Sequence, residues 1–206
     1  ATIGHGLGIA PSVVISKSMD STGGDSGAWA VQHTSLAASN ILRLNTTAAT
    51  SSKAGNGTLS SPTSTVFYTN YTEGLNVTGN NYIAYCFAEI PGYSSIGSYT
   101  GNGSTNGPFI YTNGMTPKWV IIKRINSTGF WDILDTTREP FNSVGNQIFA
   151  DRVDAEASND HEMDFLSNGI KLRDTSTSVN ANGSTYIYMA FGAPFGGADI
   201  APATAR

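Results

Sequence analysis

Acidic residues crowd one short stretch in the second half of the chain. They are Asp151, Asp154, Glu156, Asp160, Glu162 and Asp164, with His161 among them. Oxygen ligands at this density are typical of a site for a hard cation such as Ca²⁺. The spacing fits no EF-hand loop, however, and the glycine that such a loop needs at its sixth position is missing. A solvated acidic loop is the preferred interpretation, and no metal is expected.

A second set of carboxylates, Asp132, Asp135 and Glu139, could serve glycoside hydrolysis, which needs two cooperating carboxyl groups. Side chains alternate between the two faces of a β-strand, so Asp132 and Leu134 would share one face and Asp135 would lie on the other. That placement argues against a cooperating pair, and we expect no catalytic residues here.

Aromatic residues are a third group, because flat rings at strand ends can stack on sugars or seal a subunit interface. Ordinary half-buried sheet aromatics are the alternative reading of each. The candidates for ligand binding are Tyr93, Tyr99, Tyr111 and Phe130.

Other constellations are absent. The three histidines, His5, His33 and His161, are too scattered for a zinc triad, and no G-x-S-x-G motif occurs. The single cysteine, Cys86, lies in an apolar run and is expected to be a small buried hydrophobe. No cofactor is indicated.

Composition limits the partners. The net charge is −4, and residues 1–107 carry three basic residues against eight in residues 108–206, with no basic stripe in either half. Nucleic acid is therefore not an expected partner. No apolar run reaches the roughly 18 residues that a membrane helix needs, so membrane insertion is not expected either.

The elements that must position these side chains are expected to be strands. Charged residues make up only 13% of the chain, and Gly, Ser, Thr and Asn, which favour turns over helices, take their place. Helix would be limited to a turn or two at Ser35–Asn40 and Asp151–Ser158. Apolar, β-branched runs predict strands at Val13–Lys17, Trp29–Val31, Ile41–Leu44, Val66–Tyr68, Tyr82–Phe87, Pro108–Tyr111, Trp119–Lys123, Trp131–Ile133, Met163–Leu166, Ile170–Arg173 and Tyr186–Phe191.

Three of these blocks recur in the same order. Pro11–Gly23 aligns with Pro117–Gly129, Trp29–Val31 with Trp131–Ile133, and Tyr82–Phe87 with Tyr186–Phe191. Three collinear matches indicate an internal duplication. We therefore expect an all-β chain of two tandem, homologous β-sandwich modules, jelly-roll or laminin-G-like, with little helix.

The duplication also places boundaries. The first module would cover residues 1–97 and the second residues 98–206, with the Ser- and Gly-rich stretch 94–107 as a linker or opening loop. The runs Tyr82–Phe87 and Tyr186–Phe191 would be central strands covered on both faces. Because the first copy begins directly at its first strand, at Thr2–His5, the chain is expected to be part of a longer repeat array.

Several blocks of the second copy resemble a domain of virion structural proteins in marine tailed bacteriophages. These blocks are Gly107–Thr112, Pro117–Arg124, Phe165–Arg173 and Tyr186–Phe191, and Tyr82–Tyr93 of the first copy follows the same pattern. The first copy departs from it at Ser12 and Val13, where the second has Lys118 and Trp119.

The resemblance implies a non-enzymatic virion protein: a tail fibre, an appendage or a head-decoration module. Its expected partners are copies of itself, most simply as a homotrimer, other virion proteins and a host-surface glycan. The alternative is a secreted carbohydrate-active enzyme, or its carbohydrate-binding module, with Asp132, Asp135 and Glu139 as the first residues to mutate.

Overall fold

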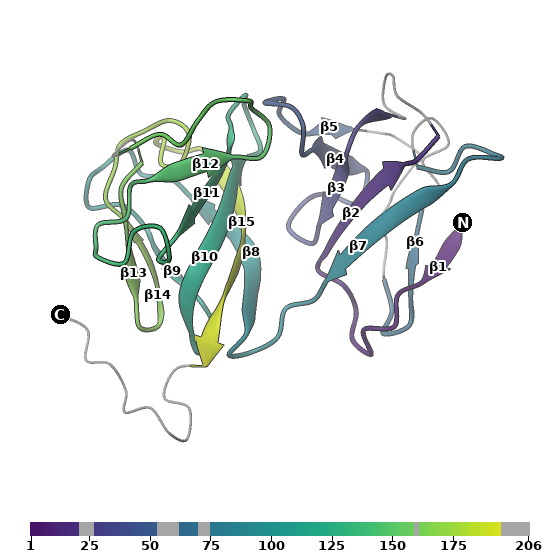
Figure 1. Ribbon diagram of the computed structural model, residues 1–206, viewed down its shortest axis with the longest axis horizontal. Helices are drawn as coiled ribbons and strands as arrows, with labels where there is room; N and C mark the ends of the chain where they lie inside the picture. Colours follow the sequence, from purple (N-terminus) through teal and green to yellow (C-terminus); the bar gives the residue numbers. More distant parts are fainter. Residues whose placement is uncertain (21–26, 53–61, 70–74, 159–160, 195–206) are drawn as a thin grey trace. The chain divides into compact units, whose positions relative to one another are not determined.

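The computed structural model describes residues 1–20, 27–52, 62–69, 75–158 and 161–194. Within these ranges the protein is all-β, with several antiparallel sheets and no helix, an arrangement consistent with a β-sandwich (Figure 1). Neither of the short helical turns considered for residues 35–40 and 151–158 forms. The chain divides into two compact units, residues 1–88 and 89–206.

Unit 1 contains a five-stranded antiparallel sheet and a two-stranded sheet. The larger sheet has the order β5-β4-β3-β2-β7, and β1 pairs with β6 in the smaller one. The strands are β1 (Thr2–Gly4), β2 (Val13–Ser18), β3 (Ala30–His33), β4 (Asn40–Arg43), β5 (Ser51–Ser52), β6 (Val66–Tyr68) and β7 (Tyr82–Phe87).

Unit 2 contains a five-stranded sheet of order β12-β11-β10-β15-β8 and a three-stranded sheet of order β13-β14-β9. The strands are β8 (Ser94–Thr100), β9 (Phe109–Tyr111), β10 (Met115–Arg124), β11 (Trp131–Asp135), β12 (Gln147–Phe149), β13 (Met163–Leu166), β14 (Gly169–Leu172) and β15 (Thr185–Pro194).

Every predicted strand is present, with ends shifted by a few residues. The three aligned sequence blocks lie on strands with matching neighbours: β2 and β10, β3 and β11, and β7 and β15. The smaller sheets match as well, because β1 pairs with β6 as β9 pairs with β14. Homology of the two units remains a proposal that this shared order favours. The last three residues of the first aligned block, residues 21–23, fall outside the described residues.

Two expectations need correction. The stretch expected to be a linker or loop contains β8, which pairs with β15 along its whole length, so unit 2 begins at Glu89 and the expected boundary at residue 97 falls inside a strand. The second correction concerns β7, which is not central. It lies at the end of its sheet, and Ile83, Ala84 and Tyr85 are exposed. The corresponding β15 does lie between two strands, as expected, and is largely buried.

The core of unit 2 lies between its two sheets. Its apolar cluster combines β9, β10, β11, β13, β14 and β15, and includes Ile122, Leu134, Ile170, Leu172 and Tyr186, all fully buried. In unit 1, one apolar cluster contains Ala30, Ile41 and Leu75, and further buried apolar residues include Val14, Leu42 and Phe67. In the described ranges, no helix is long and apolar enough to cross a membrane.

Candidate functional site

Asp132, the first candidate carboxylate, is fully buried in unit 2 on the core-facing side of β11. The Nδ1 atom of buried His161 is 3.4 Å from its Oδ1 atom, and neither carboxylate oxygen has a hydrogen-bond partner among the described residues. Burial raises the pKa of Asp132, and His161 offsets part of that effect. A carboxylate enclosed in this way has no access to a substrate.

The other two candidates hold local structure. Asp135 accepts a 2.6 Å hydrogen bond from Nε of Arg138, and the hydrogen bonds from Arg138 help to keep the Asp135 pKa low. Glu139 caps a loop by accepting the backbone N–H groups of Gly145 and Asn146 at 2.7 and 2.8 Å. As the strand alternation predicts, Asp132 and Asp135 are on opposite faces.

The acidic stretch does not converge either. Asp151 accepts the backbone N–H of Trp131, Glu156 pairs with Arg138, and Asp164 pairs with Arg173. Asp160 lies outside the described residues. Among the residues that the structure describes, no three acidic, histidine or cysteine side chains are grouped as metal ligands would be.

The four aromatic candidates lie in separate surroundings. Tyr99 stacks on Tyr186 with ring centroids 5.0 Å apart and donates its hydroxyl to the carbonyl of Val179 at 2.7 Å, so it belongs to the packing of unit 2. Tyr93 is exposed and contacts Phe191 edge to face.

Phe130 forms a half-buried cluster with Phe149 and Arg152. Its ring meets that of Phe149 edge to face, and the guanidinium of Arg152 lies 4.2 Å from the Phe130 centroid. A cation above these rings occupies the face on which a sugar would stack.

Tyr111 lies on β9 with Phe109, two residues away on the same face. Both are exposed, by 58% and 47%, while Ile110 between them is buried in the core. Tyr111 is opposite Gly169 in the neighbouring strand β14, and the Phe109 ring lies over this glycine, since an added Cβ would meet Phe109 Cζ at 2.5 Å. Phe109, which was not among the candidates, thus joins Tyr111 in an aromatic pair; the alternation of β9 could have revealed it.

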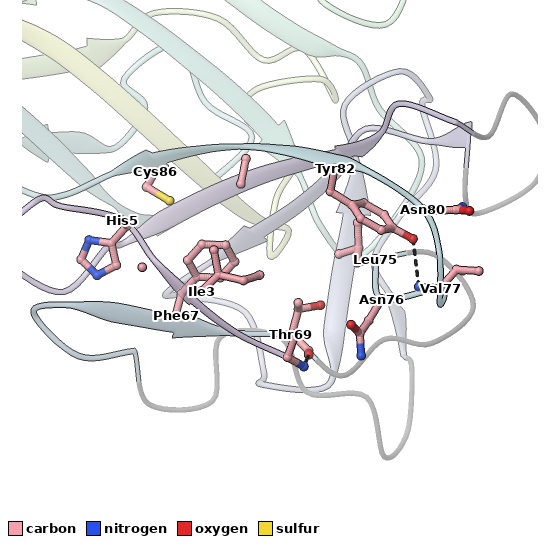
Figure 2. A pocket seen from close by; sticks show the side chains of 13 residues that line it. Ile3, His5, Phe67, Thr69, Leu75, Asn76, Val77, Asn80, Tyr82 and Cys86 are labelled. Atoms are coloured by element: carbon pink, nitrogen blue, oxygen red, sulfur yellow. Dashed lines mark hydrogen bonds between the residues drawn. The ribbon is translucent and has the colours of Figure 1, made fainter.

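Sequence reasoning missed a cavity of about 540 Å³ in unit 1 (Figure 2). It lies between the two-stranded sheet, which contributes Ile3 and Phe67, and the exposed strand β7, which contributes Ala84 and Cys86. The segment before β7 closes one side with Leu75.

Polar groups at the cavity are mostly engaged. The hydroxyl of Tyr82 accepts the backbone N–H of Val77 at 2.9 Å, drawn as a dashed line in Figure 2. The two ring nitrogens of His5 contact the carbonyl of Thr63 and the N–H of Leu7. Cys86 is half-buried rather than buried, and burial raises its thiol pKa, which keeps the sulfur protonated and weakly nucleophilic. The lining therefore combines apolar side chains with polar groups, among them the Thr69 hydroxyl, which is buried and has no hydrogen-bond partner among the described residues.

Comparison with known proteins gives one family. No curated protein and no solved structure matches the chain. A family described as a domain of unknown function, DUF7483, matches residues 1–194, a span that includes unit 1 and every described strand of unit 2. The chain therefore belongs to the DUF7483 family.

Proposed function

We propose that this protein is a non-enzymatic structural protein of a bacteriophage virion, a tail fibre, appendage or head-decoration module. It assembles with copies of itself, as a homotrimer, and with other virion proteins, and it attaches to a host-surface glycan. The particle assignment derives from the resemblance of the strand blocks to marine phage proteins. The non-enzymatic assignment is supported by the complete burial of Asp132 and by the structural engagement of Asp135 and Glu139.

The observation that carries the attachment role is the exposed aromatic pair of Phe109 and Tyr111. Two exposed rings on one face of a strand offer apolar surface on which a sugar ring can stack, and their rigid side chains lose little entropy on binding. The low charge of the chain is compatible with a neutral glycan.

The location in a particle is tested by mass spectrometry of purified virions together with immunogold labelling. The proposal expects the chain as a stoichiometric component on the particle surface, and its absence from the particles would contradict the proposal. Sedimentation of the purified chain tests the homotrimer.

The attachment role is tested on a glycan array. Tyr111→Ala is expected to weaken the strongest glycan signal by about tenfold or more, in line with the loss of one stacking aromatic. Phe141→Ala is the matched control, because Phe141 is also an exposed aromatic of unit 2 (81%) but lies outside β9. An equal loss in both variants would contradict a site at β9.

The alternative, a secreted carbohydrate-active enzyme or its binding module, shares the aromatic pair. A hydrolysis screen separates the two: release of reducing ends that Asp132→Ala abolishes would favour the enzyme, and glycan binding by a chain absent from virions would favour the binding module.

A further inference from the structure

Strand β7 has an open edge. It pairs with β2 on one side, and no described strand pairs with it on the other. The corresponding strand β15 pairs with β10 on one side and with β8 on the other. An equivalent hydrogen bond in each unit supports this correspondence. The hydroxyl of Tyr82 accepts the backbone N–H of Val77, and the hydroxyl of Tyr186 accepts the backbone N–H of Ala181. β7 thus presents the edge that β8 covers in unit 2.

The register identifies the backbone groups on this edge. Met19 donates its N–H to the carbonyl of Asn81, so Asn81 and every second residue after it face β2. The backbone groups of Tyr82, Ala84 and Cys86 then face the open side. An unpaired row of this kind is a template for another strand.

The cavity beside β7 corresponds to a space that is filled in unit 2. On the core-facing side of β15, Tyr188 lies opposite Gly97 of β8 and Tyr186 lies opposite Tyr99. A side chain at Gly97 would meet the Tyr188 ring, since an added Cβ would lie 3.0 Å from its hydroxyl. The large residue is therefore on β15 and the small one on β8.

In unit 1 the large residue of this pair is missing. Ala84 occupies the position of Tyr188, and no described strand supplies a partner for Tyr82 as β8 supplies Tyr99 to Tyr186. The missing ring volumes leave the cavity that Ala84, Phe67 and Leu75 line (Figure 2).

We propose that the edge of β7 binds an extended segment of another polypeptide as an added antiparallel strand, whose large apolar side chain opposite Ala84 fills the cavity. Main-chain hydrogen bonds would hold the strand, and the cavity would select its sequence. The exposed apolar side chains of Ile83 and Tyr85 favour a peptide partner over water at this edge. This inference goes beyond the virion role and holds whether or not the chain belongs to a particle.

The test uses the full chain and fluorescent peptides that copy residues 92–102, which contain β8. One peptide keeps Gly97, and the other carries Gly97→Phe so that a ring lies opposite Ala84. Fluorescence anisotropy is expected to show at least about tenfold tighter binding of the Phe peptide, the scale expected for burying one aromatic side chain. A third peptide with both Gly97→Phe and Ser95→Pro, which removes an N–H facing the partner strand, should lose this binding.

Exchanging the sizes provides the decisive control. Ala84→Tyr places a tyrosine where unit 2 has Tyr188, which lies opposite Gly97. This variant should therefore prefer the Gly97 peptide over the Phe peptide. If the tyrosine variant does not fold, Ala84→Leu is the smaller change to use in its place, and it should weaken binding of the Phe peptide. The absence of peptide binding, or a preference that does not respond to residue 84, would overturn the proposal. Sedimentation that shows a dimer dissociated by Tyr85→Lys would assign the edge to a second copy and also overturn it.

Discussion

Tyr99 and Tyr111 carry the same side chain in the same unit, yet their surroundings differ. Tyr99 is packed on Tyr186 with its hydroxyl bonded to Val179, whereas Tyr111 projects from β9 into solvent. Tyr99 contributes to stability through these contacts, and Tyr111 is available to a ligand.

Replacing the Tyr99 hydroxyl tests this difference. Tyr99→Phe leaves the Val179 carbonyl without its donor and is expected to lower the free energy of unfolding by about 1 kcal/mol. Tyr99→Ala, which also removes the stacked ring, should cost about 3–5 kcal/mol. Urea titrations give both values. Tyr111→Phe is the control and should leave stability unchanged; a loss equal to that of Tyr99→Phe would contradict the assignment.

Asp132 predicts a pH dependence. Its raised pKa means that the folded state binds this proton more tightly than the unfolded state does. The contribution of Asp132 to the free energy of unfolding is therefore most favourable below the ordinary pKa of about 3.9, and it falls as pH rises through the raised pKa. Asp132→Asn lacks this fall. The variant should therefore gain stability relative to the native chain from about pH 4 upward, by about 1.4 kcal/mol per unit of pKa shift.

Urea unfolding of both proteins between pH 3 and 7 measures this gain, and their other carboxyl groups cancel in the difference. Repeating the comparison with His161→Gln introduced into both proteins removes the titration of the neighbouring imidazole ring. A difference that shrinks with rising pH would show that Asp132 is stabilised as an anion.

At the scale of elements, the apolar β-branched runs were sufficient to predict most strands, because they match the period of a half-buried sheet. β8 was missed because Ser94–Thr100 is rich in small residues and reads as a loop. These small residues have a packing reason in the structure: Gly97 makes room for Tyr188, a partner ninety-one positions later that no local pattern identifies.

The Gly97–Tyr188 pair can be tested as a size exchange. Gly97→Leu should destabilise the chain by about 1–3 kcal/mol, because its side chain would overlap the Tyr188 ring. Adding Tyr188→Ala, which reproduces Ala84 of unit 1, should recover much of the loss. Thermal unfolding of the two single variants and the double variant measures the coupling. Additive losses would contradict the pairing that the β7 proposal uses.

β7 shows a different limit of sequence reasoning. Its run of apolar residues resembles that of β15, and both predicted a strand covered on both faces. Burial depends on the neighbouring strand as well as on the residues themselves, and of these two strands only β15 has a described strand on each side. The aligned blocks predict the shared scaffold but not the difference at its edge.

At the scale of the whole molecule, two compact units in which the three aligned strands are arranged in the same order fall within one family match. Each unit has a five-stranded sheet, but in unit 2 β8 pairs with β15, whereas no described strand of unit 1 pairs with the corresponding side of β7, and a cavity lies beside β7. In this account, unit 1 is the acceptor for an added strand, and unit 2 displays the aromatic face of β9.

Hydrogen exchange of the free chain, followed residue by residue by NMR, tests this account most directly. The amides of Tyr82, Ala84 and Cys86 should exchange on the order of 100-fold faster than those of Tyr186, Tyr188 and Ala190, because β8 protects only the second set. Addition of the Gly97→Phe peptide should slow the first set. Equal protection of both sets in the absence of peptide would show that the edge of β7 is already closed and would contradict the account.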